Sequence, residues 1–86
     1  MATVARINGI KIQFYWDDHP PAHFHAEYGE DEALFNIDTL EITKGHLPNR
    51  AKVLVLEWAA EHRDELKQNW DKARKPEPLN EIDPLP

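Results

Sequence analysis

The sequence contains no cysteine, and only three glycines and one methionine among its 86 residues. Without cysteine the chain offers neither a disulfide nor a thiolate ligand for a metal, which is typical of proteins from a reducing compartment. No apolar run approaches the roughly 20 residues that span a bilayer. Residues 1–10 also lack the basic stretch and long apolar run of a signal peptide. We therefore expect a soluble, cytoplasmic protein that does not cross a membrane.

An excess of positive charge is also missing. The formal net charge is −6 at pH 7, and the basic residues are mixed with acidic ones along the chain. The sequence has one short basic cluster, KARK at residues 72–75, and Asp71 and Glu77 flank it. Because binding to a phosphate backbone needs clustered Lys and Arg, the charge disfavours a general nucleic-acid-binding protein.

Residues 3–43 show mainly the period-two pattern of β-strands. In GIKIQFYW, apolar residues alternate with polar ones, as expected for a strand with one buried face. The preceding Asn8-Gly9 pair is a strong hairpin signal, so residues 3–7 are expected to pair with residues 10–16. The same pattern predicts further strands at 22–28 and 32–38, joined by a turn at 29–31, and a short fifth strand at 40–43.

The second half of the chain changes to a helical period. From about Arg50 to Arg74, apolar residues recur at steps of three, four or eight, which predicts one long helix with a single apolar stripe. The stripe comprises Ala51, Val55, Trp58, Leu66, Trp70 and Ala73, and Val53, Leu54 and Leu56 widen it near the start. A break near His62 is conceivable, but no glycine or proline requires one.

The C-terminal segment 76–86 contains four of the seven prolines and cannot form a helix or a central strand. It is therefore either disordered or an extended strap. The sequence as a whole predicts an α+β fold, with a small antiparallel sheet of four to five strands packed against one long C-terminal helix. We expect a single domain over residues 1–75, followed by the proline-rich tail 76–86.

Three of the five histidines lie within seven residues, in the segment DDHPPAHFHAEY. On a strand, His23, His25 and Glu27 point to one face, whereas the apolar residues between them suit the core. Side chains at i and i+2 stand roughly 6–7 Å apart, within reach of one ion. His23, His25 and Glu27 are therefore candidate ligands for a divalent metal such as zinc, iron, nickel or manganese, and His19 could fold back to join them.

Two other interpretations of this segment stay open. The histidines could form a polar row on the surface or at an interface. Alternatively, His19 or His23 beside Asp17 or Asp18 could act in acid/base catalysis. The candidate functional face for all these readings comprises His19, His23, His25, Glu27, Asp17 and Asp18. By contrast, His62 lies on the apolar side of the predicted helix and is expected to be a structural residue bonded to a carbonyl or a carboxylate.

The segments FYWDDHPPAHFHAEYG, EALFNIDTLEITKGHLPNRA and VLEWAAEHRDELKQNWDKA together resemble the small bacterial family known as domain of unknown function 4160. The resemblance covers roughly residues 3–75 and establishes no catalytic residue. The family's hallmark residues map onto His19, Pro20, Pro21, His23, His25, Glu27, Trp58, His62 and Trp70. The resemblance also implies pairing with proteins of another family, domain of unknown function 2442, in an arrangement similar to a toxin–antitoxin system.

Three functional hypotheses follow, and they leave open whether the protein is an enzyme. The first is that the protein is the toxin-like, protein-binding half of such a pair, with a domain of unknown function 2442 protein as its partner. The second is a small metal- or histidine-dependent hydrolase or nuclease that uses the HPPAHFH segment. The third is a structural homodimer in which the histidine face is buried between two subunits.

Overall fold

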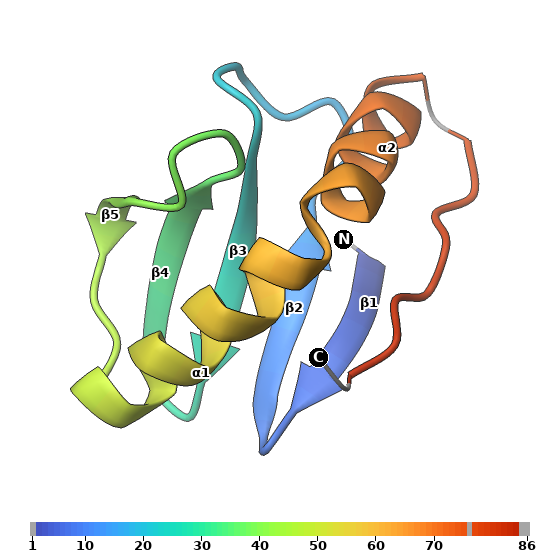
Figure 1. Cartoon of the computed structure of the whole chain (residues 1–86). Coiled ribbons are helices and arrows are strands. Elements are labelled where there is room, and N and C mark those ends of the chain that lie inside the picture. The colour runs from blue at the N-terminus through green and yellow to red at the C-terminus, as the bar shows by residue number, and fades with distance from the viewer. Residues whose placement is uncertain (1, 76, 85–86) are drawn as a thin grey trace.

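Five antiparallel strands and two helices make up the computed structural model, which describes residues 2–75 and 77–84 (Figure 1). The strands lie in the sheet in the same order as in the chain. Their bounds are β1 Ala2–Ile7, β2 Ile10–Phe14, β3 His23–Tyr28, β4 Asp31–Asn36 and β5 Ile42–Gly45. The sheet is therefore a simple meander with β3 at its centre, and the α+β prediction with five strands is confirmed.

The tight turns of the meander fall where the sequence places them. Asn8 and Gly9 both adopt positive φ, +47° and +83°, as a two-residue type I′ hairpin turn requires. Gly29 (φ +60°) opens the turn between β3 and β4, a conformation that glycine adopts without steric cost. These turns fix the pairing of β1 with β2 and of β3 with β4, and therefore decide which side chains of β3 face the core.

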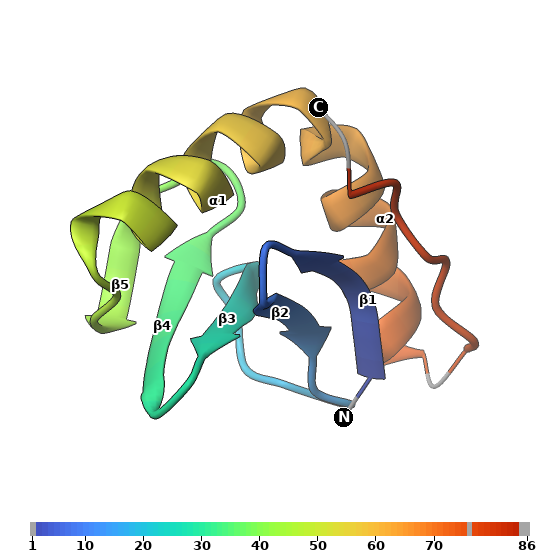
Figure 2. The same cartoon turned by 90° about the horizontal axis from the view of Figure 1, so that it is seen from below.

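The hydrophobic core lies between one face of the sheet and the helices (Figure 2). Phe24 of β3 stacks on Phe35 of β4, with ring centroids 5.2 Å apart, and meets the edge of Trp58 at 6.3 Å. All three side chains are almost completely buried. The main residues of the predicted helical stripe are also buried in this core: Ala51, Val55, Trp58, Leu66, Trp70 and Ala73. Of the residues expected to widen the stripe, Leu54 and Leu56 are partly buried against the core, whereas Val53 is 50% exposed.

The helical segment is divided into two helices, so the prediction of one continuous helix is wrong. Helix α1 spans Asn49–Glu61 and α2 spans Arg63–Arg74. His62 separates them with φ −123° and ψ 23°; its N–H bonds to the carbonyl of Ala59, and its own carbonyl accepts from Leu66. Neither helix of the described residues is long and apolar enough to cross a membrane.

The break is in keeping with the size of the molecule. A straight helix over residues 49–74 would be roughly 39 Å long at 1.5 Å per residue, whereas the longest extent of the molecule is 33 Å. Such a helix would overhang the sheet and leave the apolar residues of its last turns unpacked. With the turn at His62, α2 instead packs against β2 and β3. Asp64 and Glu65 in the first turn of α2, and Lys72 and Arg74 in its last turn, suit the dipole of a separate helix.

The described part of the tail, residues 77–84, is an extended strap beside β1 (Figure 1). The N–H of Ile82 donates to the Val4 carbonyl at 2.8 Å, and the Trp58 indole donates to the Asp83 carbonyl at 2.8 Å. The amide of Asn69, a fully buried residue of α2, bonds to both the N–H and the C=O of Asn80 at 2.9 Å. Residues 76 and 85–86 lie outside the described residues.

The strap should contribute measurably to stability through Asn69. We expect Asn69→Ala to lower the free energy of unfolding by about 2 kcal/mol, because two backbone groups lose their partner and a buried side chain is truncated. Urea denaturation measures the change. Asn80→Ala should have little effect, because only the Asn80 backbone makes these bonds, and Gln68→Ala at an exposed position of α2 is the matched control. Equal stability of the Asn69 and Gln68 variants would contradict the assigned role.

Candidate functional site

His23 and His25 lie on the face of β3 opposite to Phe24, as strand alternation predicts. His25 stands between Gln13 of β2 and Leu34 of β4 in the sheet register. However, each histidine is only 8% exposed. The alternative of a solvent-facing row of histidines is therefore wrong, and both faces of this part of β3 are covered.

Two aromatic rings cover the histidines. The ring of Tyr15 stacks on His25 with a centroid distance of 4.2 Å and an interplanar angle of 22°. The ring of Trp70, from α2, lies 5.1 Å from His23. Between β2 and β3 the chain returns across the end of the sheet, where the N–H of Asp17 donates to the Ala73 carbonyl at 3.1 Å. This bond ties the loop to α2 and positions the next residue, Asp18.

Asp18 connects the two histidines through a single carboxylate oxygen. Its Oδ2 lies 2.9 Å from Nε2 of His23 and 3.0 Å from Nε2 of His25. One ligand atom from each of Asp18, His23 and His25 lies within 4.8 Å of the others, close enough to hold one metal ion. Two imidazole nitrogens and a carboxylate oxygen are a donor set that suits zinc, iron or manganese.

The hydrogen bonds of His23 decide which of its nitrogens carries a proton. Nδ1 lies 2.8 Å from the carbonyl oxygen of Pro21, which can only accept, so Nδ1 must donate. In a neutral imidazole, Nε2 is then an acceptor, yet it faces the Oδ2 of Asp18 at 2.9 Å. Two acceptors at this distance need a cation between them, either a proton or a metal ion.

A second irregularity lies at His25. Among the described residues, two buried side-chain atoms have no hydrogen-bond partner, Nδ1 of His25 and Oε1 of Gln13. The two residues are directly opposite each other in the register of β3 and β2. Buried polar atoms are rarely left without a hydrogen-bond partner. Two such atoms on neighbouring residues therefore single out this face of β3.

The surroundings of the cluster are negatively charged. Burial raises the pKa of the Tyr15 hydroxyl above its usual value, and the carboxylates of Glu32, Glu27 and Asp18 raise it further. For Asp18 itself, burial alone would raise the pKa. Hydrogen bonds from the His25 side chain and the His19 backbone, together with the charge and hydrogen bond of His23, outweigh burial, so the pKa of Asp18 lies below its usual value.

The structure brings together only part of the face that the sequence predicts. Asp18 takes the third place in the cluster, which the sequence analysis assigned to Glu27; Glu27 lies opposite Lys11 and Glu32 in the sheet and is not part of the cluster. His19 is exposed and contributes its backbone N–H to Asp18 Oδ1 at 2.9 Å. The chain therefore folds back towards the two histidines before the prolines, as predicted, but the side chain that reaches them is that of Asp18 and not that of His19.

Two further residues, Tyr15 and His62, complete the comparison between the sequence and the structure. Nothing in the sequence reveals the stacking of Tyr15 on His25, because it depends on the path of the loop. His62 stays outside the cluster; its Nδ1 bonds to a Glu65 carboxylate oxygen at 2.6 Å and its ring lies 5.3 Å from Trp58. The structural interpretation of His62 agrees with this arrangement.

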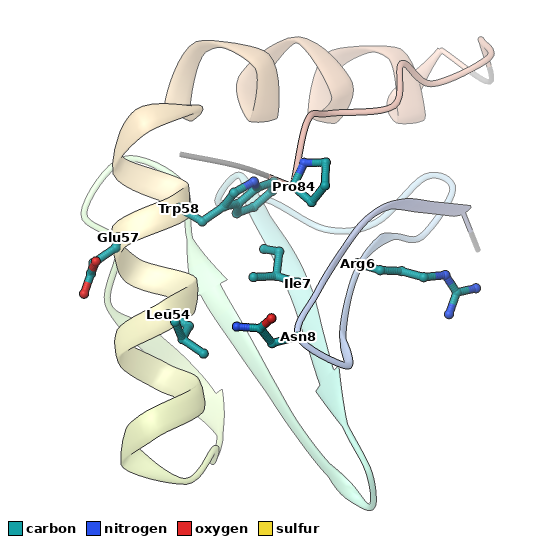
Figure 3. Close-up of a pocket in the computed structure, with 7 residues that line it drawn as sticks. All are labelled: Arg6, Ile7, Asn8, Leu54, Glu57, Trp58 and Pro84. Atoms are coloured by element: carbon teal, nitrogen blue, oxygen red, sulfur yellow. The ribbon is translucent and has the colours of Figure 1, made fainter.

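A pocket elsewhere on the molecule lies between the β1–β2 hairpin, α1 and the strap (Figure 3). Ile7, Trp58 and Pro84 face one another there, whereas Glu57 and Arg6 point outward (Figure 3). Its lining contains no histidine and no residue of the Asp18 cluster. Because the pocket lacks converging groups with catalytic or metal-binding chemistry, the Asp18–His23–His25 cluster is the better candidate site.

Comparison with protein families gives one result. The model of the family described as domain of unknown function (DUF4160) matches residues 9–71, most of the chain. This confirms the resemblance found in the sequence. No curated protein and no solved structure gives a match. The matched range includes the whole Asp18–His23–His25 cluster and the tryptophan that covers His23.

The lowered pKa of Asp18 can be tested in the metal-free protein. In a carbon-13 NMR titration with a chelator present, the Asp18 carboxyl should titrate below the reference value of 3.8. Its stabilising contribution is then fully present above pH 3.8 and is lost as the pH falls through the lower native pKa. His25→Ala should raise the midpoint, because a hydrogen bond to the carboxylate is removed. A midpoint at or above 3.8 in the parent protein would contradict the assignment.

Proposed function

The chain belongs to the domain of unknown function 4160 family, and we propose that it binds a divalent transition-metal ion through Asp18, His23 and His25. The observation that carries the proposal is the pair of acceptors at 2.9 Å, Nε2 of His23 and Oδ2 of Asp18. The proton of a neutral His23 lies on Nδ1, where it is donated to the Pro21 carbonyl. A metal ion between Nε2 of His23 and Oδ2 of Asp18 would then bind both acceptors at once. The bond to a carbonyl is also how metal-binding histidines are commonly oriented.

The dimensions of the cluster support the same proposal. Tetrahedral ligands at about 2.0–2.1 Å from a zinc ion are roughly 3.3 Å from one another. The two Nε2–Oδ2 distances are 2.9 and 3.0 Å, so ligation requires that these two pairs separate by a few tenths of an ångström. The third pair, the two Nε2 atoms, lies within 4.8 Å. Small rotations of the side chains provide this movement, and Asp18 lies on a loop rather than in a strand.

Three protein ligands leave at least one coordination position for water or a substrate, as in catalytic rather than structural sites. The Asp18 side chain is 21% exposed, which provides access from solvent. A divalent metal held here would supply Lewis-acid chemistry of the kind used in hydrolysis. The carboxylates of Glu27 and Glu32 near the site, with the net charge of −6, favour a neutral or cationic substrate over nucleic acid.

Metal binding to purified, tag-free protein tests the proposal. We expect isothermal titration with Zn²⁺ to give one site per chain, and Co²⁺ to give the visible absorption bands of a protein-bound ion. Asp18→Asn, His23→Ala and His25→Ala should each weaken binding at least tenfold, because each removes one of three ligands.

Glu27→Gln is the matched control that separates the two ligand sets. It removes the carboxylate that the sequence predicts as a ligand and leaves the structural cluster intact, so it should bind Zn²⁺ like the parent. His46→Ala changes an exposed histidine outside the cluster and controls for nonspecific binding. Circular dichroism establishes that each variant is folded. A folded parent that binds neither ion would refute the proposal and leave the Asp18–His23 pair as an acid/base candidate.

A second proposal concerns partner binding, and one feature of the sheet favours it. Of its two edge strands, β1 is hydrogen-bonded to the strap through Ile82, whereas β5 bonds only to β4 in the sheet of the described residues. Residues 43–45 of β5 are exposed. Because an open edge accepts a strand from another chain, β5 is where we propose that a domain of unknown function 2442 protein docks, in a cytoplasmic toxin–antitoxin-type pair.

Co-expression tests this second proposal. The two proteins should elute from a sizing column as one complex, and Thr43→Asp should weaken it because a charge at a sheet edge opposes strand addition. Gln68→Asp on the exposed face of α2 adds the same charge elsewhere and should leave the complex intact. Separate elution of the unmodified pair would contradict the proposal, and elution of the protein alone at twice its mass would favour the homodimer.

A further inference from the structure

The two histidines of the cluster differ in what holds the nitrogen that faces away from Asp18. In His23, Nδ1 already donates to the Pro21 carbonyl at 2.8 Å. In His25, Nδ1 is buried and has no hydrogen-bond partner among the described residues. The nearest charged group is the carboxylate of Glu32, whose Oε2 lies 3.4 Å from that nitrogen. The orienting contact that His23 possesses is therefore incomplete for His25.

Metal binding would change the requirement at His25. With the carboxylate of Asp18 at 3.0 Å, a neutral His25 satisfies this contact by carrying its proton on Nε2. A metal ligand must present the lone pair of Nε2, so the proton of the neutral ring then lies on Nδ1. That N–H is buried and needs an acceptor, and Oε2 of Glu32 lies 3.4 Å from Nδ1 without forming a hydrogen bond in the present arrangement.

We propose that Glu32 is the positioning residue of His25: its carboxylate accepts the Nδ1–H bond that orients the ring for metal binding. The proposal deepens the metal-site assignment and rests on it. The backbone of Glu32 is already fixed, because its carbonyl accepts the N–H of His46 at 3.0 Å. Its side chain is 41% exposed and therefore has room to move the few tenths of an ångström that a hydrogen bond requires.

The alternative acceptor is Oε1 of Gln13, the other buried atom without a partner, on the residue opposite His25. Glu32 is the better candidate for two reasons. Its carboxylate makes a stronger, charge-assisted hydrogen bond than an amide does. It also lies near enough to this face to influence Tyr15, the ring stacked on His25: among the charged groups that raise the pKa of Tyr15, Glu32 acts most strongly.

Zn²⁺ affinity in Glu32 variants tests the inference, measured by competition with a chromophoric chelator. Glu32→Ala should weaken binding roughly 10- to 100-fold, the usual effect of losing a carboxylate that orients a ligand. Glu32→Asp keeps the charge but shortens the side chain by one carbon, so a residue that positions His25 should lose most of the same affinity. Glu30→Ala, at an exposed site two residues away, removes a carboxylate from the same turn and should bind like the parent.

Nitrogen-15 NMR of the histidine rings supplies a readout that a purely electrostatic role would not change. In the parent, the His25 proton should move from Nε2 in the metal-free protein to Nδ1 in the Zn²⁺-loaded protein. The Nδ1–H of the loaded parent should show the low-field shift of a hydrogen-bonded proton, and Glu32→Ala should lose that shift. Parental affinity in Glu32→Ala, or in Glu32→Asp alone, would overturn the inference while the metal site stands. A folded parent that binds no Zn²⁺ would overturn the metal site and the inference together.

Discussion

The central strand β3 is the constraint on which the rest of the structure depends, because it is buried on both faces and each face has a different chemistry. Phe24 and Ala26 belong to the core under α1, and their complete burial is the kind of apolar contact that dominates folding free energy. His23 and His25 occupy the other face, where burial of an imidazole requires hydrogen-bond partners. The alternation that places apolar residues in the core therefore also places two histidines on a buried face, where they need hydrogen-bond partners. The Asp18 carboxylate and the Pro21 carbonyl provide hydrogen-bond partners for the two histidines, and the rings of Tyr15 and Trp70 cover them.

A second constraint couples this strand to the C-terminal half. Trp70 lies beside His23, and the neighbouring Asn69 is bonded to the strap, so α2 holds both the covering ring of the site and the tail. The division of the helical segment at His62 makes this possible, since α2 would otherwise project beyond the sheet. The loop before β3 is tied to the same helix through Asp17 and Ala73. Substitutions in α2 should therefore alter the Asp18–His23–His25 cluster even where the substituted residue does not contact Asp18.

The sequence predicts the local features of this fold well. Asn8-Gly9 specifies its hairpin because few other pairs adopt two positive φ angles, and period-two alternation places Phe24 and His25 on opposite faces of β3. What it does not reveal depends on the path of the chain through space. The helix divides at His62 although residues 49–74 contain no glycine or proline that would mark the division. Burial of His23 follows from the ring of Trp70, 47 positions later in the sequence. Strand periodicity places Glu27 on the same face as His23 and His25, which made it the predicted third ligand. Periodicity describes only residues of one strand, however, and Asp18 belongs to the loop before β3.

The site combines strong polar contacts with incomplete ones, and this combination argues for a function rather than for stability alone. A network that served only the fold would gain from satisfying every buried atom, because a half-satisfied network is less stable than an apolar one. Here the contact of 2.9 Å between Asp18 and His23 needs a cation, either a proton or a metal ion, whereas Nδ1 of His25 and Oε1 of Gln13 have no hydrogen-bond partner among the described residues. The proposed metal ion would supply the cation at the first place, and the proposed hydrogen bond to Glu32 would satisfy Nδ1 of His25 once that nitrogen carries the ring proton. Asp18, His23 and His25 are close enough to hold one metal ion, and the ligation that we propose would therefore explain both features through a single ligand.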